Sequence, residues 1–190
     1  MFTREKTLGN VLCLAALCMT LSATAIAADH ISNALSTSHK TDTQIAEEVA
    51  HAIRMYPRYG IFDWVEGTVQ NGVVTLNGSV REPYRKDDYA KIVERISGVT
   101  KVNNELRVLP LSNFDDEIRR AAFRAIYRDP MFTAYAIQAN PPIHIIVENG
   151  KVTLKGVVAN PMDRQVAESR VRTNVMAFDV TNDLQVEERG

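Results

Sequence analysis

The amino-acid sequence predicts an α+β protein of two tandem small domains. Each has the order α-β-β-α-β, with two helices on one face of a three-stranded sheet. The first observation is a repeat, since the segment Gln70–Val80 returns 78 residues later as Glu148–Val158. The second is an Asn-Gly pair at the same place in both copies, and the third is the helical spacing of apolar residues on either side. A register kept without a gap from residue 70 to 108 indicates two copies of one folding unit.

The domain boundaries follow from where these patterns begin and end. We expect the first domain over residues 41–109, a short linker over residues 110–112 and the second domain over residues 113–188. The first helices of the two copies align at an offset of 73 residues rather than 78. The second copy therefore has five extra residues between its first helix and the strand that follows.

The first helix of each copy is predicted from its apolar stripe. Residues three or four positions apart lie on one face of a helix, and this spacing is met by Ile45, Val49 and Ile53. The second copy repeats it with Ile118, Ala122 and Ile126. Polar residues that accept hydrogen bonds from the first turn are expected to cap these helices. The candidates are Thr41 or Asp42 in the first copy and Asn113 or Asp115 in the second.

Strands and a second helix follow in each copy. Each Asn-Gly pair predicts a tight hairpin turn, because both residues tolerate the positive φ of a type I′ turn. The outgoing strands alternate in polarity, so one of their faces lies on a core. Pro83 and Pro161 then begin a second helix, where the missing N–H of proline costs nothing. The glycines of the repeated motif are Gly72, Gly78, Gly98, Gly150 and Gly156.

Residues 1–27 are typical of a secretory signal peptide. Arg4 and Lys6 precede an apolar stretch, and small residues lead up to Ala27, after which we expect cleavage. The apolar stretch is shorter than the roughly 20 residues that span a bilayer. Residues 28–40 are polar and are expected to form a flexible leader. These features predict an exported protein of the periplasm.

Cysteine and charge content exclude further classes. Cys13 and Cys18 both lie within the signal, so we expect no disulfide in the exported chain. Each follows a leucine, whereas a lipoprotein needs a small residue before its acylated cysteine, so a lipoprotein is not expected. The chain has 22 basic and 23 acidic residues. This balance argues against nucleic acid as a partner, because phosphate binding usually requires a basic excess.

Two short motifs carry a resemblance to a known family. Gly72–Gly78 has the pattern Gly-x-Val-x-Leu-x-Gly, and Gly98–Leu106 has the pattern Gly-Val-x-x-Val-x-Asn-x-Leu. Gly150–Gly156 repeats the first motif, and Val180–Leu184 repeats the end of the second. Together with the order of the elements, these motifs resemble the BON domain, named for bacterial OsmY and nodulation proteins.

The resemblance extends over nearly the whole chain after the signal. The doubled arrangement is similar to the osmotically inducible periplasmic members of that family. The resemblance implies attachment to phospholipid membranes and a role in envelope stress, and it supplies no catalytic residues. One departure is that Met176-Ala177 replaces Gly98-Val99. We expect the turn before the last strand to differ there, because methionine adopts a left-handed conformation less readily than glycine.

Catalytic and cofactor-binding patterns are not recognisable in the sequence. Adjacent carboxylates such as Asp87-Asp88 point in different directions on a helix and do not form a pair for acid–base chemistry. We therefore expect no enzyme, no metal, no cofactor and no small-molecule substrate. The histidines lack the spacing of metal ligands and are expected to be incidental or on the surface. They are His30, His39, His51 and His144.

Two features of the second copy are candidate lipid contacts. The first is an arginine row on its first helix, where a spacing of four places three side chains on one face. The second is the apolar and aromatic loop after that helix, which suits the depth of lipid headgroups. The alternatives are an ordinary solvated helix face for the row and closure of a small core for the aromatic residues. The candidates are Arg119, Arg120, Arg124, Arg128, Met131, Phe132 and Tyr135.

The leading hypothesis is a non-enzymatic periplasmic module that binds anionic phospholipid surfaces in envelope maintenance or stress. The alternative is a chaperone-like module for envelope proteins, in which a free sheet edge adds an extended client strand. A third hypothesis, glycan binding, would use Tyr59 or Trp64 to stack on a sugar ring. We also expect the second copy to make the membrane contact, because the first helix of the first copy carries Glu47 and Glu48.

Overall fold

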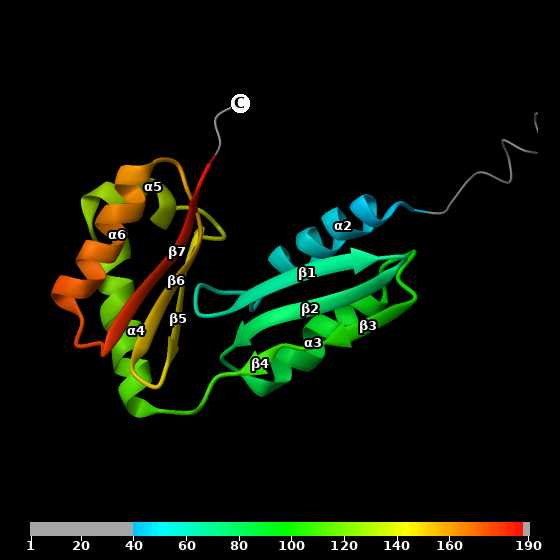
Figure 1. Ribbon diagram of the computed structural model, residues 1–190, viewed down its shortest axis with the longest axis horizontal. Helices are drawn as coiled ribbons and strands as arrows, with labels where there is room; N and C mark the ends of the chain where they lie inside the picture. Colours follow the sequence, from blue (N-terminus) through cyan, green and yellow to red (C-terminus); the bar gives the residue numbers. More distant parts are fainter. Residues whose placement is uncertain (1–39, 188–190) are drawn as a thin grey trace, which may run out of the picture. The chain divides into compact units, whose positions relative to one another are not determined.

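The structure is a computed structural model that describes residues 40–187. In both halves of this range a small sheet is covered on one face by helices (Figure 1). The expected signal peptide over residues 1–27, and the expected leader up to residue 39, lie outside the described residues. None of the helices in the described range has the length and apolar character needed to cross a bilayer.

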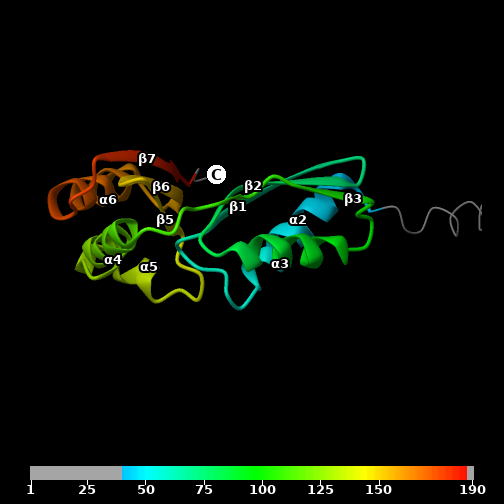
Figure 2. The ribbon, with the colours of Figure 1, turned by 90° about the horizontal axis from the view of Figure 1, so that it is seen from below.

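The first module consists of two helices and one sheet. In the sheet β2 lies in the middle, antiparallel to β1 and parallel to β3 and β4. Figure 2 shows both helices on the same side of the strands. Its elements are α2 (Asp42–Arg54), β1 (Trp64–Gln70), β2 (Val73–Val80), α3 (Pro83–Glu94), β3 (Lys101–Asn104) and β4 (Arg107–Val108).

The second module repeats this plan with additions after its first helix. Its sheet has the order β5-β6-β7, with β5 antiparallel and β7 parallel to the central strand. A 3-10 turn and a short helix occupy the expected insertion. The elements are α4 (Asn113–Tyr127), η1 (Pro130–Phe132), α5 (Thr133–Ala136), β5 (Ile143–Glu148), β6 (Lys151–Val158), α6 (Pro161–Asn174) and β7 (Asp179–Val186).

The predicted α+β class with two tandem modules is confirmed, with one correction in the last strand of the first module. We expected a single strand there, and the structure has β3 and β4 with a break at residues 105–106. Both pieces keep the same register, since Leu76 faces Asn104 and Ser79 faces Arg107. They therefore form one interrupted edge strand, while β7 of the second module is continuous.

Each module has its own hydrophobic core between its helices and its sheet. The predicted helix stripes are the buried ones, which follows from the driving force to remove apolar surface from water. The first core includes Ile45, Val49, Ile53, Val74, Leu76, Tyr89, Val93 and Leu106. The second includes Ile118, Ala122, Ile126, Phe132, Ile145, Leu154, Ala167, Val171 and Leu184.

The Asn-Gly hairpin turn of each module is held by an aspartate in the first turn of its first helix. The carboxylate of Asp42 accepts hydrogen bonds from the N–H groups of Asn71 (2.6 Å) and Gly72 (2.9 Å). The asparagine and the glycine have φ angles of 51° and 74°, as a type I′ turn requires. This aspartate thus ties the start of the helix to the tip of the hairpin.

Asp115 makes the equivalent contact in the second module, and this corrects one predicted cap. Its carboxylate accepts from the N–H groups of Asn149 (3.0 Å) and Gly150 (2.7 Å). The cap of α4 is instead Ser112, whose hydroxyl accepts from the Asp115 N–H. In the first module Thr41 caps α2, as predicted.

The turn before the last strand differs between the modules, as predicted from Met176. In the first module this turn contains Gly98 with a φ angle of 96°. In the second, α6 continues to Asn174, and Val175 after it is already extended. Both routes lead to the same backbone hydrogen bond at the hairpin turn, from Thr100 to the Gly72 carbonyl and from Phe178 to the Gly150 carbonyl.

Candidate functional site

Three of the predicted arginines lie on the exposed side of α4 and at its end. Arg120, Arg124 and Arg128 are all solvent-exposed. They line a groove of about 430 Å³ together with three further arginines and several apolar residues. We call this feature the arginine groove. Its lining consists of Arg58, Gly60, Ile61, Phe62, Arg81, Arg85, Arg120, Phe123, Arg124 and Arg128.

The charges of the arginine groove are only partly balanced. Arg85 pairs with the buried carboxylate of Asp63, and Arg81 pairs with Asp116 at 3.1 Å. Arg58 stacks over the ring of Tyr84 at 5.3 Å. Within residues 40–187, the three arginines of α4 and its C-cap form no ion pair. Several cations therefore converge on one apolar floor without a matching set of anions.

Arg119 does not belong to this surface, and its prediction as a lipid contact is wrong. Its side chain is 3% exposed. One guanidinium nitrogen donates to Asp116 (2.7 Å) and another donates to the carbonyl of Val147 (2.6 Å). The hydrogen bond from Arg119, joined by the charge of Arg81, lowers the pKa of the Asp116 carboxyl. One step along a helix turns a side chain by about 100°, which takes Arg119 from the exposed row to the sheet edge.

The loop after α4 is mainly part of the core. Phe132 is fully buried, so its prediction as a lipid contact is also wrong. The hydroxyl of Tyr135 donates to Asp163 (2.5 Å) and accepts from the Ala159 N–H (2.8 Å). Burial first, and then the bond to Asp163, raise the pKa of this tyrosine. Of the three predicted loop residues, Met131 is exposed and Tyr135 is half-buried.

The loop between α2 and β1 contacts the second module, which was not foreseen. Both modules belong to one compact unit. The Ile145 N–H donates to the carbonyl of Ile61 (2.7 Å), and the ring nitrogen Nδ1 of His144 donates to the carbonyl of Asp63 (2.7 Å). Ile61 and Phe62 pack against the core of the second module and also line the arginine groove. The groove is thus built from both modules.

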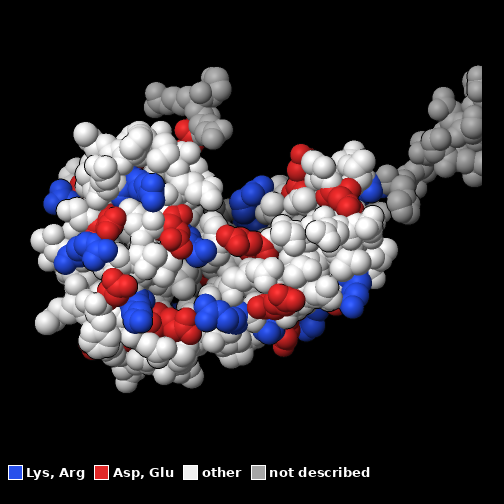
Figure 3. Space-filling model, in the orientation of Figure 1, with Lys and Arg blue, Asp and Glu red and all other residues white. Residues whose placement is uncertain are grey.

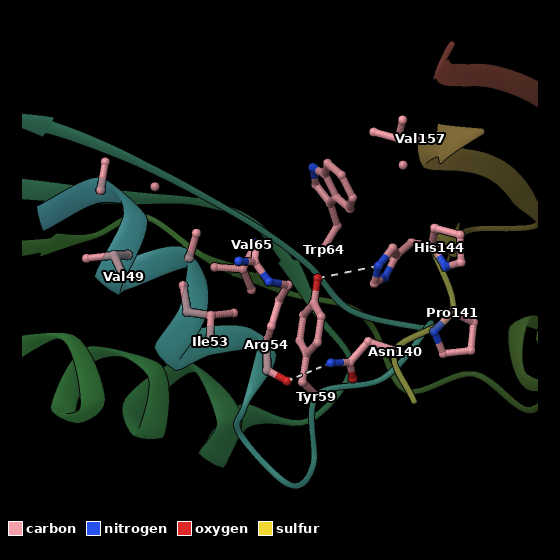
Figure 4. Close-up of a pocket in the computed structure, with 15 residues that line it drawn as sticks. Val49, Ile53, Arg54, Tyr59, Trp64, Val65, Asn140, Pro141, His144 and Val157 are labelled. Carbon is pink, nitrogen blue, oxygen red and sulfur yellow. Dashed lines mark hydrogen bonds between the residues drawn. The ribbon is translucent and has the colours of Figure 1, made fainter. Parts of the chain in front are cut away.

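His144 is buried, which corrects its expected place as an incidental or surface histidine. It is 6% exposed and lies beside the rings of Tyr59 and Trp64 (Figure 4). With the proton on Nδ1, its Nε2 faces the Tyr59 hydroxyl at 3.4 Å and accepts from it. Burial lowers the pKa of His144, so the ring is held in its neutral form. The periodicity of the strand gave no signal for this contact, which depends on the other module.

A buried carboxylate supports the same region of the first module. Asp63 has no exposed surface and accepts hydrogen bonds from the guanidinium of Arg85, the Arg81 N–H (2.8 Å) and the Tyr89 hydroxyl (3.4 Å). Burial, with the charge of Asp63 next, raises the pKa of Tyr89 well above its usual range. This network fixes the loop that presents Ile61 and Phe62.

Two aromatic residues considered for sugar stacking are engaged in the structure. The Tyr59 ring packs against Tyr89 and His144, with centroid distances of 6.4 and 5.3 Å. Trp64 packs edge-on against His144 at 5.1 Å, and Lys155 lies over its ring at 5.7 Å. Both rings are therefore partly occupied by contacts within the protein.

The remaining surface is mixed in charge. On the face shown in Figure 3, acidic and basic side chains alternate without a large patch of either sign. In the described part of the chain, no three His, Cys, Asp or Glu residues are grouped as metal ligands are. The arginine groove is the feature in which side chains of one charge gather around an apolar floor.

Comparison with known protein families identifies the two modules. The family model of the BON domain matches the chain twice, over residues 41–110 and 115–188. The chain belongs to the BON domain family. BON domains are modules of the phospholipid-binding type and are generally non-catalytic, and this chain contains two of them in tandem.

Other comparisons add little to this assignment. No curated protein matches the chain. Among solved structures, the tandem BON chain is similar to CdsD, a structural protein of the type III secretion system of Chlamydia trachomatis. The identity is 11% and the TM-score 0.30, covering 74% of this chain and 91% of that chain. The C-terminal domain of CdsD gives 12% identity and a TM-score of 0.28, covering 78% and 100%. Likeness at this level bears on neither function nor partner.

Proposed function

We propose that this tandem BON protein is a non-enzymatic module of the periplasm that associates with anionic phospholipid surfaces. The arginine groove makes the contact. The observation that carries the proposal is the convergence of six arginines on an apolar floor. Family membership supports the ligand class, and the signal-like residues 1–27 of the sequence support the compartment.

The chemistry of the groove fits lipid headgroups. Guanidinium groups bind phosphate oxygens through bidentate hydrogen bonds, and several arginines can bind one cluster of headgroups. Each basic side chain near an anionic leaflet contributes about 1 kcal/mol. Phe123, which is 39% exposed between Arg120 and Arg124, supplies an aromatic ring at the depth where headgroups meet acyl chains. Family membership also supports a role in maintaining the envelope under osmotic or other stress.

Removing the arginine row tests this proposal. We expect the change of Arg120, Arg124 and Arg128 to Ala to weaken binding to vesicles of phosphatidylglycerol and phosphatidylcholine. Loss of three charges at about 1 kcal/mol each predicts a weakening of about a hundredfold. Co-sedimentation at low salt measures it, and vesicles of phosphatidylcholine alone should not retain the protein.

A matched variant distinguishes the effect of the arginine row on vesicle binding from the effect of net charge. Changing Lys91, Lys101 and Lys151 to Ala removes the same number of charges from exposed positions outside the groove. We expect this variant to bind nearly as well as the unchanged protein. Equal losses in both variants would mean that net charge, rather than the groove, sets the affinity. Full binding by the arginine variant would exclude the groove as the contact.

A further inference from the structure

The arginine groove is lined mainly by apolar surface, although six of its residues are arginines. Its floor includes Ile61 and Phe62, and the exposed ring of Phe123 contributes to its side on α4. The long aliphatic stems of the arginines add to this apolar lining, while their charged heads reach toward water. The groove is therefore amphipathic, with an apolar floor and cationic groups around it.

The apolar floor is held in place by contacts within the protein. The carbonyl of Ile61 accepts from the Ile145 N–H at 2.7 Å, and both Ile61 and Phe62 pack against the core of the second module. The buried carboxylate of Asp63, the next residue, accepts from the Arg81 N–H at 2.8 Å. The groove is thus largely formed before a ligand binds, and its volume of about 430 Å³ lies in the range typical of small-molecule sites.

Gly60 leaves part of the groove open. This residue belongs to the groove lining, and a Cβ atom added to it would meet no heavy atom of the described chain within 4 Å. The absence of a side chain at this position therefore leaves space beside the floor. A larger residue here would occupy that space without a clash.

The charged and the apolar parts of the groove point together to one kind of ligand. A phosphate headgroup by itself uses the guanidinium groups of Arg120, Arg124 and Arg128 and gains nothing from an apolar floor. An uncharged alkyl chain gains from the floor and leaves three arginines of the groove without an ion-pair partner. A molecule in which an anionic head is joined to an alkyl chain satisfies both parts.

We propose that the arginine groove holds one alkyl chain of an anionic amphiphile. The phosphate head is bound by the arginines of α4 and its C-cap, and the first part of the chain lies on Ile61 and Phe62. The ligand is thus a single lipid-like molecule and not only the surface of a bilayer. This inference rests on the proposed function, because it uses the same groove and the same headgroup chemistry.

Alkyl phosphates that remain monomeric test the inference without a bilayer. Hexyl, octyl and decyl phosphate carry the same head, so titration calorimetry with each of them isolates the contribution of the chain. Burial of a whole methylene group raises affinity about fourfold, and burial of half of its surface raises it about twofold. We expect the dissociation constant to fall about tenfold or more from hexyl to decyl phosphate. Equal affinity for the three compounds would overturn the proposal.

Vesicles and monomers together separate this inference from the proposed function. If vesicles of phosphatidylglycerol retain the protein but decyl phosphate binds no more tightly than inorganic phosphate, the proposed function holds and the inference is wrong. If decyl phosphate binds tightly and the vesicles do not retain the protein, the groove takes the monomer and the proposed surface contact is wrong. Tighter binding of a peptide that alternates glutamate and leucine than of decyl phosphate would assign the groove to an acidic polypeptide and overturn the inference.

Filling the groove tests where the chain lies. Gly60→Phe keeps all six arginines and occupies the space beside the floor, so decyl phosphate should bind about tenfold more weakly and no more tightly than hexyl phosphate. Gln185→Phe places the same ring at an exposed position outside the groove and should leave binding unchanged.

A second variant removes apolar surface instead of adding it. Phe123→Ala deletes an exposed ring and leaves the buried core intact, and it should weaken decyl phosphate more than hexyl phosphate. If the dependence of affinity on chain length survives in both Gly60→Phe and Phe123→Ala, the chain does not lie in the groove and the proposal is wrong.

Discussion

At the contact between the two modules, His144 is a buried polar residue. Burial lowers the pKa of His144, and the neutral ring donates one hydrogen bond to a carbonyl and accepts another from a tyrosine. A proton added to Nε2 would turn an acceptor into a donor that faces another donor. The contact therefore depends on pH through one ring.

At the scale of this residue we predict a loss of stability toward acid. The folded-state pKa of His144 lies below its ordinary value of 6.5, so the unfolded chain takes up the proton first. Stability should be complete above about pH 6.5 and should fall as the pH decreases below it, until the folded state also takes up the proton. Urea unfolding at about pH 7.5 and 5.5 measures the slope.

The variant His144→Gln serves as the control for this pH dependence. It keeps a donor and an acceptor on the side chain but does not titrate, so its unfolding free energy should change less between the two pH values. Asp116 and Glu168 have a lowered pKa, from ordinary values of 3.8 and 4.5, so their contributions are lost only at lower pH. An equal slope in the variant would show that His144 is not the group responsible.

At the scale of elements, the link between the first helix and the hairpin turn organises each module. In each module one carboxylate accepts hydrogen bonds from two backbone N–H groups of the turn. These bonds hold the start of the helix against the strand pair. We predict that Asp115→Ala destabilises the protein by about 2 kcal/mol, because it leaves the buried N–H group of Gly150 without a partner. Asp42→Ala should cost less, since Asp42 is only partly buried.

Thermal or urea unfolding of both variants checks this order. Asp183→Ala is a suitable control, because this exposed carboxylate pairs with Lys155 only at 3.9 Å and should contribute less than about 1 kcal/mol. If Asp42→Ala lowered the free energy of unfolding more than Asp115→Ala does, the proposed dependence of the loss on burial of the carboxylate would be wrong.

The elements were predictable from the sequence to the extent that they depend on local pattern. The repeat, the Asn-Gly turns and the proline starts define the order of helices and strands, and the change at Met176 predicts a different turn. The inward orientation of the Arg119 side chain and the burial of His144 were not predictable. Both depend on contacts with segments distant in the sequence, Val147 for the arginine and the Asp63 carbonyl for the histidine.

The same limit applied to the site. The spacing of Arg120, Arg124 and Arg128 predicts a row on one face, which is how the structure places them. The arginines that complete the groove, Arg58 and Arg85 among them, come from the other module, so no local pattern connected them to the row. Asp116, three residues before Arg119, was a signal that the latter would be paired.

At the scale of the whole molecule, the two modules share a fold and differ in surface chemistry. The positions on α2 that correspond to Arg120, Arg124 and Arg128 are occupied by Glu47, His51 and Met55. An anionic bilayer attracts the first set and repels the glutamate, over a distance limited to about 8 Å at physiological salt. We therefore propose that the second module contacts the membrane and that the first supports it.

Exchanging these residues within the full chain tests the division of labour. Arg120→Glu, Arg124→His and Arg128→Met give α4 the residues of α2, and we predict loss of binding to phosphatidylglycerol vesicles. Adding Glu47→Arg, His51→Arg and Met55→Arg to that variant restores the charge on α2. Because α2 lacks the apolar floor that Ile61 and Phe62 give the groove, binding should return only in part and should vanish at high salt. Complete recovery would show that charge alone, on either module, is sufficient for the membrane contact.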